Sequence, residues 1–409
     1  MKKLFNLIFI LAVCFGHAQK KDTKVLFVIV DGIPGDVIEK VPTPNLDKIA
    51  AIGGYTRAYV GGGRDSYSQT PTISAVGYNS LLTGTWVNKH NVWGNSIKKP
   101  NYNYWTVFRM AKEYRPELKT AVFSTWLDNR TKLIGEGLPE TGHVKMNYHF
   151  DGYEHDTIAF PHGTSSHYIQ NIDKHVVSKA FDCIKDNAPD LSWLYLEYTD
   201  HMGHEHGDGD LFYNAIKEAD KQIGKVWEAI TYRQKQFNEH WEIYITTDHG
   251  RTKEDGKHHG GQSDRERLTW IVTNTQNLNS YFKTHQPGIV DILPTMLQSL
   301  NIKPKKELLW EIDGVPLTGE VSLVNAKAVK NDNTLHVTWD VINTKGKVKI
   351  WVATTNEFNT GGTDSYKLLD QVAIKKGEAS IDISQLPSKI YKIVLETKYN
   401  TANTWVVEK

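Results

Sequence analysis

Acidic side chains follow three apolar segments of the sequence, at the point where each segment ends. The acids are Asp31, Asp200 and Asp248, and the segments before them are residues 24–30, 191–198 and 242–247. The carboxyl ends of parallel strands meet at one edge of a sheet, where open α/β sheets bind their ligands. A single aspartate at a strand end is often only a turn former or a helix cap. Three of them indicate one shared site.

Histidines accompany two of these acids. His204 lies four residues after Asp200, His249 adjoins Asp248, and His259 follows in a loop that contains glycine. Seven of the 17 histidines lie between residues 201 and 259. Any one of them could be an ordinary surface imidazole. As a group, carboxylate oxygens and imidazole nitrogens suit zinc and related divalent ions, so the pattern predicts a metal site.

A hydroxyl group completes the predicted chemistry. Ser74 stands at the start of a predicted helix, after a loop rich in glycine and serine at residues 61–68. Backbone amides at a helix N-terminus stabilise developing negative charge, which favours Ser74 as a nucleophile beside bound metal. Two alternatives stay open at this point, because Ser74 could be a helix N-cap and Thr72 is a competing hydroxyl.

The elements that must position these residues alternate between strand and helix. The strands are predicted at 24–30, 120–124, 191–198, 242–247 and 268–273, and the helices at 43–52, 104–117, 168–186, 211–238 and 287–300. The continuous apolar run of the first strand is typical of a strand buried on both faces of a parallel sheet. This alternation predicts an α/β fold with a mainly parallel central sheet flanked by helices.

The pattern changes after about residue 320. Short alternating segments replace the helices, with strands predicted at 334–339, 348–354, 379–383, 391–398 and 404–407. This texture predicts a small all-β sandwich, in which Trp339 and Tyr391 loosely resemble fibronectin type III core aromatics. No metal or acid–base group of residues lies there, so the sandwich is predicted to be an accessory module that packs, or contacts glycan or a cell surface. Its deletion is predicted to leave turnover of small substrates unchanged.

The start of the chain resembles an export signal. Lys2 and Lys3 precede an apolar run at residues 4–15, which is too short to span a membrane, and the small-x-small pattern of a signal-peptidase site follows at 16–18. The predicted division is a signal peptide at 1–19, a catalytic domain at 20–320 and the sandwich at 321–409, in a periplasmic or secreted protein. The alternative is a lipoprotein anchored at Cys14, although Val13 is bulkier than the residue usually found before an acylated cysteine.

Composition excludes other classes of function. The 48 Lys and Arg residues nearly balance 47 Asp and Glu residues, and the net charge is +1. A protein that coats nucleic acid would carry a basic surface, so a small substrate is predicted instead. No other stretch reaches the apolar length of a transmembrane helix.

These motifs together resemble the alkaline phosphatase superfamily, specifically its type I phosphodiesterase/nucleotide pyrophosphatase branch, over residues 24–317. The shared features occur in the same order: a strand-end Asp31, Ser74 ten residues before Gly84, Asp200-x-x-Gly-His204, Asp248-His249-Gly250, and His259-Gly260. The branch usually has Thr as its nucleophile, and a Ser at that position keeps the hydroxyl.

The resemblance implies a set of roles. Asp200, His204 and His259 would hold one zinc ion, Asp31, Asp248 and His249 the other, and Ser74 would bridge toward both. Asn95 would contact a phosphoryl oxygen. The pairing with Gly260 favours His259 over the adjacent His258, and His201 and His206 are expected to lie outside the ligand set.

The same resemblance implies hydrolysis of a phosphodiester, with a nucleotide as one candidate substrate, through a covalent intermediate on Ser74. Phosphomonoesterases of the superfamily carry extra cations for the third phosphoryl oxygen. In the corresponding stretch, residues 123–132, Trp126 replaces the expected Lys and Arg130 is shifted, so we expect a preference for diesters, with both side chains near the substrate.

Alternatives within the superfamily are a phosphomonoesterase, a phosphonate hydrolase, a sulfatase and a cofactor-independent phosphoglycerate mutase. Neither Cys14 nor Cys183 stands in the Cys-x-Pro-Ser-Arg context of a sulfatase, and the mutase is cytoplasmic. From another class, the chain could be an inactive surface-binding protein. That reading predicts a lost metal carboxylate, whereas all the carboxylates are present. The aromatic residues between 143 and 168 are expected to form an insertion that either covers the site or packs on the core.

Overall fold

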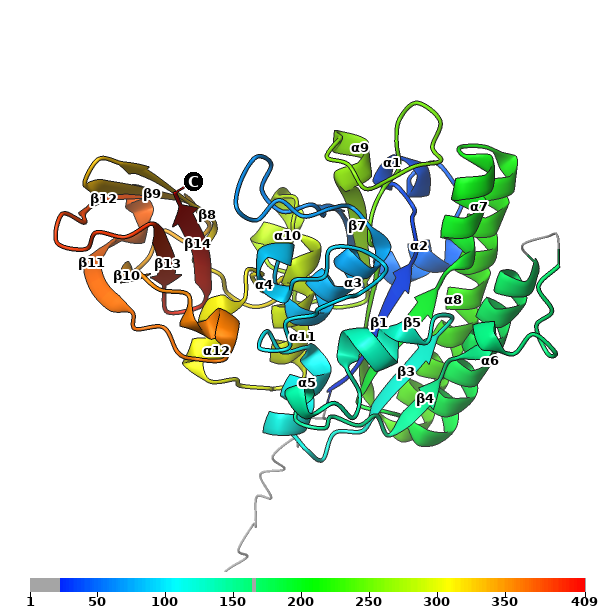
Figure 1. Ribbon diagram of the computed structural model, residues 1–409. Helices are drawn as coiled ribbons and strands as arrows, with labels where there is room; N and C mark the ends of the chain where they lie inside the picture. Colours follow the sequence, from blue (N-terminus) through cyan, green and yellow to red (C-terminus); the bar gives the residue numbers. More distant parts are fainter. Residues whose placement is uncertain (1–22, 164–166, 409) are drawn as a thin grey trace, which may run out of the picture.

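The structure is a computed structural model, which describes residues 23–163 and 167–408 (Figure 1). The predicted signal peptide at residues 1–19 lies outside the described residues. Within them, no helix is long and apolar enough to cross a membrane.

A mixed, mostly parallel sheet of seven strands forms the centre of the N-terminal part. Its order is β2-β7-β6-β1-β5-β3-β4. The strands are β1 (Thr23–Val30), β2 (Gly54–Tyr59), β3 (Thr120–Ser124), β4 (Tyr148–Phe150), β5 (Leu191–Leu196), β6 (His240–Thr246) and β7 (Leu268–Thr273). β7 runs antiparallel to both of its neighbours. The predicted α/β class is therefore confirmed.

The register of β1 with its neighbours places the acids. β1 pairs in parallel with β5, Val30 opposite Leu196, and with β6, Ile29 opposite Thr246. The carboxyl ends of the three strands consequently lie side by side, and each is followed within a few residues by one of the predicted aspartates.

Helices cover both faces of the sheet (Figure 1). Along β1, Val25, Phe27 and Ile29 point into one core, and the residues between them point into the other. The first face carries α3 (Ser74–Thr83), α5 (Val107–Tyr114) and α11 (Ile292–Ser299), and the second carries α2 (Pro44–Ala50), α6 (His167–Asn187) and α8 (Asp210–Phe237). The other α-helices of the described residues are α1 (Gly35–Ile38), α4 (Val87–His90), α7 (Tyr198–His206), α9 (Asp264–Arg267), α10 (Ser280–Thr284) and α12 (Lys306–Glu311).

One predicted strand ends early. The segment predicted at 191–198 is a strand only to Leu196, and α7 begins at Tyr198. The carboxylate of Asp173 on α6 accepts hydrogen bonds from the backbone N–H groups of Glu197 and Tyr198, at 3.2 and 3.0 Å. An acid from another helix thus satisfies donors at the start of α7, a role that a local N-cap usually fills. Asp200 therefore lies in a helix and not in a loop.

Part of the aromatic insertion belongs to the sheet. β4 pairs in parallel with β3 at the sheet edge, and Phe150 stacks on Phe123 with ring centroids 5.5 Å apart. These residues pack on the core, which is one of the two alternatives expected for the insertion.

The C-terminal part consists of two antiparallel sheets that together form the predicted sandwich. One has the order β11-β10-β13-β14 and the other β12-β9-β8. Trp339 lies in its core and donates its indole N–H to the carbonyl of Ile374. The strands are β8 (Leu323–Asn331), β9 (Thr334–Val341), β10 (Lys347–Ala353), β11 (Lys367–Ala373), β12 (Glu378–Asp382), β13 (Ile390–Glu396) and β14 (Thr401–Val407).

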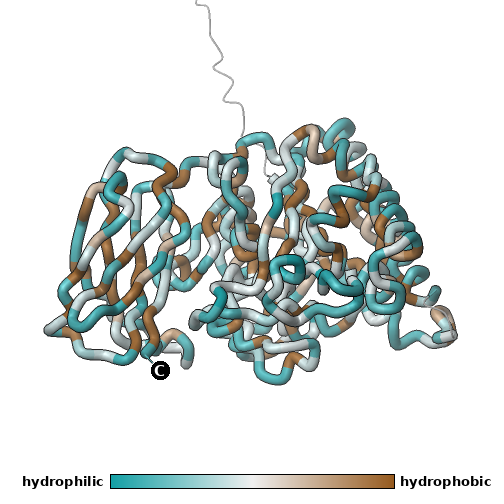
Figure 2. The backbone as a smooth tube through the Cα atoms, turned by 90° about the horizontal axis from the view of Figure 1, so that it is seen from above, coloured by the Kyte–Doolittle hydropathy of each residue, from teal (hydrophilic) through white to brown (hydrophobic). Residues whose placement is uncertain are grey.

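The sandwich is joined to the rest of the chain through a buried ion pair and a hydrogen bond from a buried lysine. Lys89 on α4 is fully buried and binds the Asp313 carboxylate at 2.6 Å and the Asn403 side chain at 3.1 Å. Lys392 on β13 binds Glu311 at 2.5 Å. In Figure 2 the sandwich lies directly beside the α/β part, and hydrophobic stretches run through both.

Candidate active site

Three of the predicted ligands meet at the ends of β1 and β6. The His249 Nε2 atom lies 3.3 Å from Asp31 Oδ1 and 3.3 Å from Asp248 Oδ2. All three side chains are buried. The Nδ1 atom of His249 lies 2.9 Å from the backbone oxygen of Gly250. This contact fixes the ring so that Nε2 faces the carboxylates.

The other three predicted ligands lie beside this group. His204 Nε2 is 3.0 Å from His259 Nε2 and 3.3 Å from Asp200 Oδ2. The rings of His249 and His259 stack at 3.7 Å between centroids, which joins the two groups. The Nδ1 atom of His259 lies 2.8 Å from the backbone oxygen of Thr72. α7 therefore delivers Asp200 and His204 one helical turn apart, on one face of the helix.

The donor set fits bound metal. Asp31, Asp248 and His249 form one group whose ligand atoms all lie within 4.8 Å of one another, and Asp200, His249 and His259 form a second. Asp31 Oδ1 and Asp248 Oδ2 are buried and have no hydrogen-bond partner, and the His249 ring nitrogen 3.3 Å from each is their one close cationic neighbour among the described residues. Buried carboxylate oxygens without donors are costly unless a cation satisfies them. The two groups share His249, whereas the family resemblance assigns it to one metal and completes the other with His204.

The acidic surroundings shift the pKa values of the site. Burial and the nearby Asp31 carboxylate raise the pKa of Asp248 well above its ordinary range. Burial disfavours charge on His249, but the carboxylates of Asp248 and Asp31 outweigh it and raise its pKa to about 9. Burial and the neighbouring His249 lower the pKa of His259 to about 4. Carboxylates and imidazoles crowded in this way hold protons that a divalent cation would replace.

Ser74 faces this group of ligands. It is the first residue of α3, where Ile73 is the N-cap residue, and its hydroxyl lies 3.3 Å from His249 Nε2. The serine is thus not the helix cap. Thr72, the competing hydroxyl, donates a hydrogen bond to the carbonyl of Gly261 and accepts one from the N–H of Gly260. Its hydroxyl is therefore already engaged as both donor and acceptor. The geometry favours Ser74 as the nucleophile.

Asn95 lies next to the same helix terminus. Its side-chain oxygen accepts the backbone N–H of Ala75 at 3.0 Å. This bond leaves the amide NH₂ group as the donor that can turn toward a ligand at Ser74.

Two tyrosines, which sequence reasoning did not single out, hold Asp31. Tyr78 on α3 and Tyr195 on β5 both donate to Asp31 Oδ2, the latter at 2.8 Å. Trp126 packs edge-on against Tyr78, with 6.4 Å between ring centroids. Trp126, which was predicted to lie near the substrate, therefore contacts Tyr78, and Tyr78 in turn binds the candidate ligand Asp31. The alternation of side chains along β5 could have placed Tyr195 on the sheet face that α3 covers. It could not have identified Tyr78 as the second tyrosine.

Arg130 is not brought to this group. Its guanidinium donates to Asp151 at 2.7 and 2.9 Å and also to Glu136. These acids, which lie in the 136–151 segment, already satisfy the guanidinium. His258 is likewise directed elsewhere, because its side chain is 72% exposed and lies 3.5 Å from Asp255. His201 and His206 lie near Glu205, outside the ligand groups.

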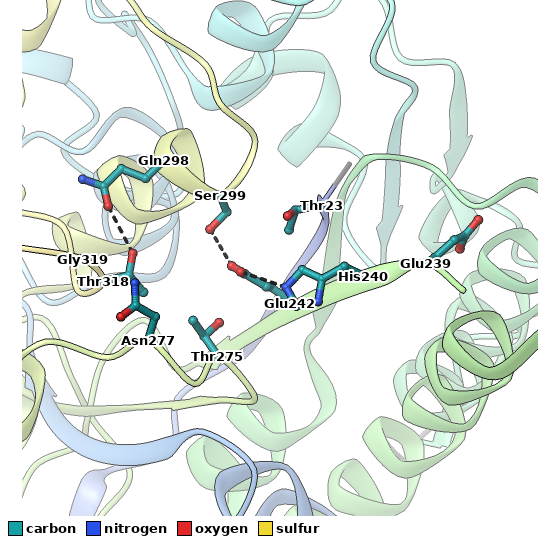
Figure 3. Close-up of a pocket in the computed structure, with 10 residues that line it drawn as sticks. All are labelled: Thr23, Glu239, His240, Glu242, Thr275, Asn277, Gln298, Ser299, Thr318 and Gly319. Carbon is teal, nitrogen blue, oxygen red and sulfur yellow. Dashed lines mark hydrogen bonds and ion pairs between the residues drawn. The ribbon is translucent and has the colours of Figure 1, made fainter. Parts of the chain in front are cut away.

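A separate pocket lies at the opposite, amino-terminal ends of β1 and β6 (Figure 3). Its volume is about 500 Å³, and Thr23, His240 and Glu242 line it. The Glu242 carboxylate accepts hydrogen bonds from Ser299 at 2.5 Å and Tyr244 at 2.8 Å. Since Glu242 is already paired, and the candidate metal ligands lie a strand length away, this pocket is not the candidate active site.

Comparison with known proteins identifies a family for most of the chain. A family model described as type I phosphodiesterase / nucleotide pyrophosphatase matches residues 25–313. Human ectonucleotide pyrophosphatase/phosphodiesterase family member 5 is 25% identical over 239 residues, which is 58% of this chain and 46% of that protein. Mouse family member 7 is 23% identical over 249 residues, 58% of this chain and 52% of that protein. The matched region thus spans about half the length of these curated relatives.

Solved structures share the fold. A 2-O GAG sulfatase superimposes with a TM-score of 0.55 at 13% identity, covering 90% of this chain and 86% of that one. A putative sulfatase from Bacteroides thetaiotaomicron gives a TM-score of 0.54 at 13% identity, covering 89% of this chain and 86% of the other. At such identities the likeness concerns the fold alone. Within the described residues Cys183 is a free cysteine, buried on α6.

Proposed function

The chain belongs to the type I phosphodiesterase / nucleotide pyrophosphatase family, and from this premise we propose that it hydrolyses phosphodiesters, nucleotide derivatives among them, with Ser74 as nucleophile. The observation that carries the proposal is the position of the Ser74 hydroxyl. It stands at a helix N-terminus, 3.3 Å from a histidine that is shared by two groups of buried carboxylate and imidazole ligands.

Two divalent ions, with zinc the best match to this donor set, would bind at these groups. Asp31, Asp248 and His249 would hold one ion, and Asp200, His204 and His259 the other. When bound, such ions supply Lewis acidity and neutralise charge on the transferring phosphoryl group. Asp31 Oδ1 and Asp248 Oδ2, which are buried without a hydrogen-bond partner and share the His249 ring as a neighbour, support this assignment.

The chain's own residues account for the remaining requirements. Ser74 Oγ would attack phosphorus and form a phosphoseryl ester as the alcohol of the substrate leaves, and water would then cleave that ester. The N-terminal end of α3 favours negative charge at the same place. Asn95, held by its bond to Ala75 N–H, would donate to a phosphoryl oxygen.

The surroundings favour a diester over a monoester. A monoester dianion requires an additional cationic donor, and the predicted one, Arg130, is paired with Asp151 and Glu136. Trp126, which packs on Tyr78, offers an aromatic surface for an ester substituent. A missing charge-assisted hydrogen bond is worth about 1 to 3 kcal/mol, so we expect kcat/KM for a diester to exceed that for the matching monoester tenfold or more.

The test uses the full chain, loaded with zinc after its metal content has been measured. Bis-nitrophenyl phosphate, nitrophenyl phosphate, nitrophenyl sulfate and a nitrophenyl phosphonate are compared as substrates. The proposal requires zinc-dependent turnover with the diester preferred. A preferred monoester, phosphonate or sulfate would replace it with the corresponding activity, and a chain that binds no metal and turns over none of the four would be a binding protein.

Export and the accessory role of the sandwich remain part of the proposal. The leader-like residues 1–19 support export, and N-terminal sequencing of the mature protein tests it by locating cleavage after Ala18 or Gln19. Glycan or cell-surface contact by residues 321–409 is the partner proposed for the sandwich, and binding of the chain to glycan arrays tests it.

A further inference from the structure

Arg251, the residue after Asp248-His249-Gly250, is fully buried at the edge of the candidate site. A buried arginine cannot lose its charge, so it requires an anionic partner and several acceptors. Arg251 has both, although the chemistry described above assigns it nothing.

The guanidinium joins three segments that carry proposed metal ligands. Nε donates to the Gly32 carbonyl, next to Asp31, at 2.9 Å. Nη1 donates to the Lys257 carbonyl, two residues before His259, at 3.1 Å. Nη2 donates to the Asp200 backbone oxygen at 2.7 Å and also to Asp200 Oδ1. One side chain thus fixes the loop after β1, helix α7 and the loop that leads to His259.

Two glycines, which have no side chain, make room for this arginine. A Cβ atom on Gly203, the glycine of the Asp200-x-x-Gly-His204 motif, would fall inside contact distance of the guanidinium carbon. A Cβ atom on Gly32 would lie 2.7 Å from Arg251 Nη2 and 2.5 Å from Asp200 Oδ1. The neighbouring backbone is therefore shaped around the contact between Arg251 and Asp200.

The two oxygens of the Asp200 carboxylate have different partners. Oδ1 is bound by Arg251, whereas Oδ2 lies 3.3 Å from His204 Nε2. When an arginine holds one oxygen of a carboxylate through hydrogen bonds, the other oxygen points in a fixed direction.

We propose that Arg251 is a positioning residue, which holds Asp200 as a ligand through Oδ2 and so determines the affinity of the metal position formed by Asp200, His204 and His259. The inference rests on the proposed function. It predicts that the two metal positions respond differently to a change at residue 251, because Asp31 and Asp248 receive no hydrogen bond from its guanidinium.

The experiment is a zinc titration of the metal-free full chain against a competing chelator, for the wild type and for Arg251→Met. Methionine keeps much of the length and removes the charge and the donors. We expect the wild type to bind two zinc ions and Arg251→Met to bind one of them 10- to 100-fold more weakly, the usual effect of removing a partner of a metal ligand. Arg251→Lys, which keeps the charge, is expected to lie between them, and it serves as the test protein if Arg251→Met does not fold.

Two controls separate positioning from a general loss of stability. Arg233→Met removes another largely buried arginine, which binds Glu239 and the Lys185 carbonyl, and should lower the melting temperature while leaving both zinc affinities within twofold. In an Asp200→Asn background, Arg251→Met should change zinc affinity no further, since its effect passes through Asp200.

The possible failures are distinguishable. If the wild type binds no zinc, the proposed function fails and the inference with it. If the wild type binds two ions and Arg251→Met binds both with unchanged affinity, showing only a lower melting temperature, Arg251 is purely structural and the inference alone is overturned.

Discussion

At the scale of single residues, the proposed chemistry depends on one hydroxyl. Ser74 Oγ is aimed at His249 and has no capping role. Ser74→Ala should lower kcat/KM for bis-nitrophenyl phosphate at least about a hundredfold, because a principal catalytic group is lost. The zinc content should stay unchanged, since the proposed carboxylate and imidazole ligands remain. Steady-state kinetics and metal analysis of the same preparation check both parts.

Ser80 provides a matched control on the same helix. It is buried, and its hydroxyl donates to the Val76 carbonyl. Ser80→Ala should cost about 1 kcal/mol of folding free energy and leave turnover within a few fold. If Ser74→Ala kept wild-type turnover, the nucleophile would have to be another hydroxyl, and Thr72→Val would be the next variant to measure.

The shifted pKa values predict that zinc binding releases protons. At pH 7 the metal-free His249 is protonated, because its pKa is raised to about 9, whereas a metal ligand must be a neutral imidazole. Zinc binding at pH 7 should therefore release at least one proton. Above pH 9 His249 is already neutral, so the release should fall by about one proton.

Calorimetric titrations in buffers of different ionisation enthalpy measure this number. Asp200→Asn is the matched control, because it weakens a ligand set without removing His249. A proton count that does not change between pH 7 and pH 10 would contradict the assignment of His249 as a ligand.

The strand-end positions of the three acids Asp31, Asp200 and Asp248 were predictable from sequence because each follows a strand of obvious apolar character. Their supporting residues were not. Tyr78 and Tyr195 reach Asp31 from positions 47 and 164 residues away in the sequence. Such contacts arise from the packing of α3 on β5, which no local spacing encodes. Arg130 was predicted to lie near the substrate, but it is paired with Asp151. The sequence did not indicate the path of the segment that carries Asp151, so this pairing could not be predicted.

At the scale of elements, the close packing of α3 on the end of β6 brings the nucleophile and the metal ligands together. Gly77 permits it, since a Cβ there would lie 2.6 Å from the Asp248 carbonyl oxygen and 2.9 Å from Asp248 Cβ. Helix propensity alone predicts that Gly77→Ala is stabilising, by up to about 1 kcal/mol. We expect the opposite, a loss of about 1 to 3 kcal/mol from overpacking.

The same substitution should weaken zinc binding about tenfold, because the clash falls on the backbone of a ligand. Chemical denaturation of the metal-free chain and zinc titration measure the two effects, and Ser80→Ala on the same helix is the comparison. A more stable Gly77→Ala variant with unchanged zinc affinity would show that α3 can move away from β6 without disturbing the site.

Elements with strong local patterns were predicted well, and those that depend on context were not. The apolar runs at β3 and β7 were placed at their observed bounds. β4, a three-residue edge strand, and β11, a mostly exposed strand, lack the buried alternation on which the prediction depends. α7 was missed because its start is satisfied by Asp173 of another helix, so the sequence around Tyr198 carries no ordinary capping signal.

At the scale of the whole molecule, the sandwich and the α/β part share a buried polar interface. Lys89 lies on α4, shortly after the nucleophile helix, and binds Asp313 and Asn403. Tyr67, in the loop that leads to Ser74, stacks on Trp405 of β14 with ring centroids 5.6 Å apart. Contacts with the sandwich therefore reach both chain segments that flank α3.

This interface argues against the prediction, made from sequence, that residues 321–409 are dispensable. That reasoning considered only where the chemical groups lie, all of them before residue 260. Truncation after Glu320 would remove Asn403 and Trp405 and leave Lys89 without part of its surroundings, and incompletely paired buried charges are strongly destabilising. It would also expose the apolar side chains that the sandwich covers.

We therefore expect the truncated chain to unfold at a temperature at least about 10 °C lower than the full chain, consistent with a loss of several kcal/mol. Turnover of bis-nitrophenyl phosphate per folded molecule should also fall, because the loop before Ser74 loses its stacking partner. Asn403→Ala, which removes the hydrogen bonds to Lys89 and to the Ile312 carbonyl and should cost about 1 to 3 kcal/mol, calibrates the effect of a single side chain. Differential scanning calorimetry and kinetics on the same samples decide the matter. A truncated chain with unchanged melting temperature and turnover would restore the original prediction and show that Lys89 is satisfied within the α/β part alone.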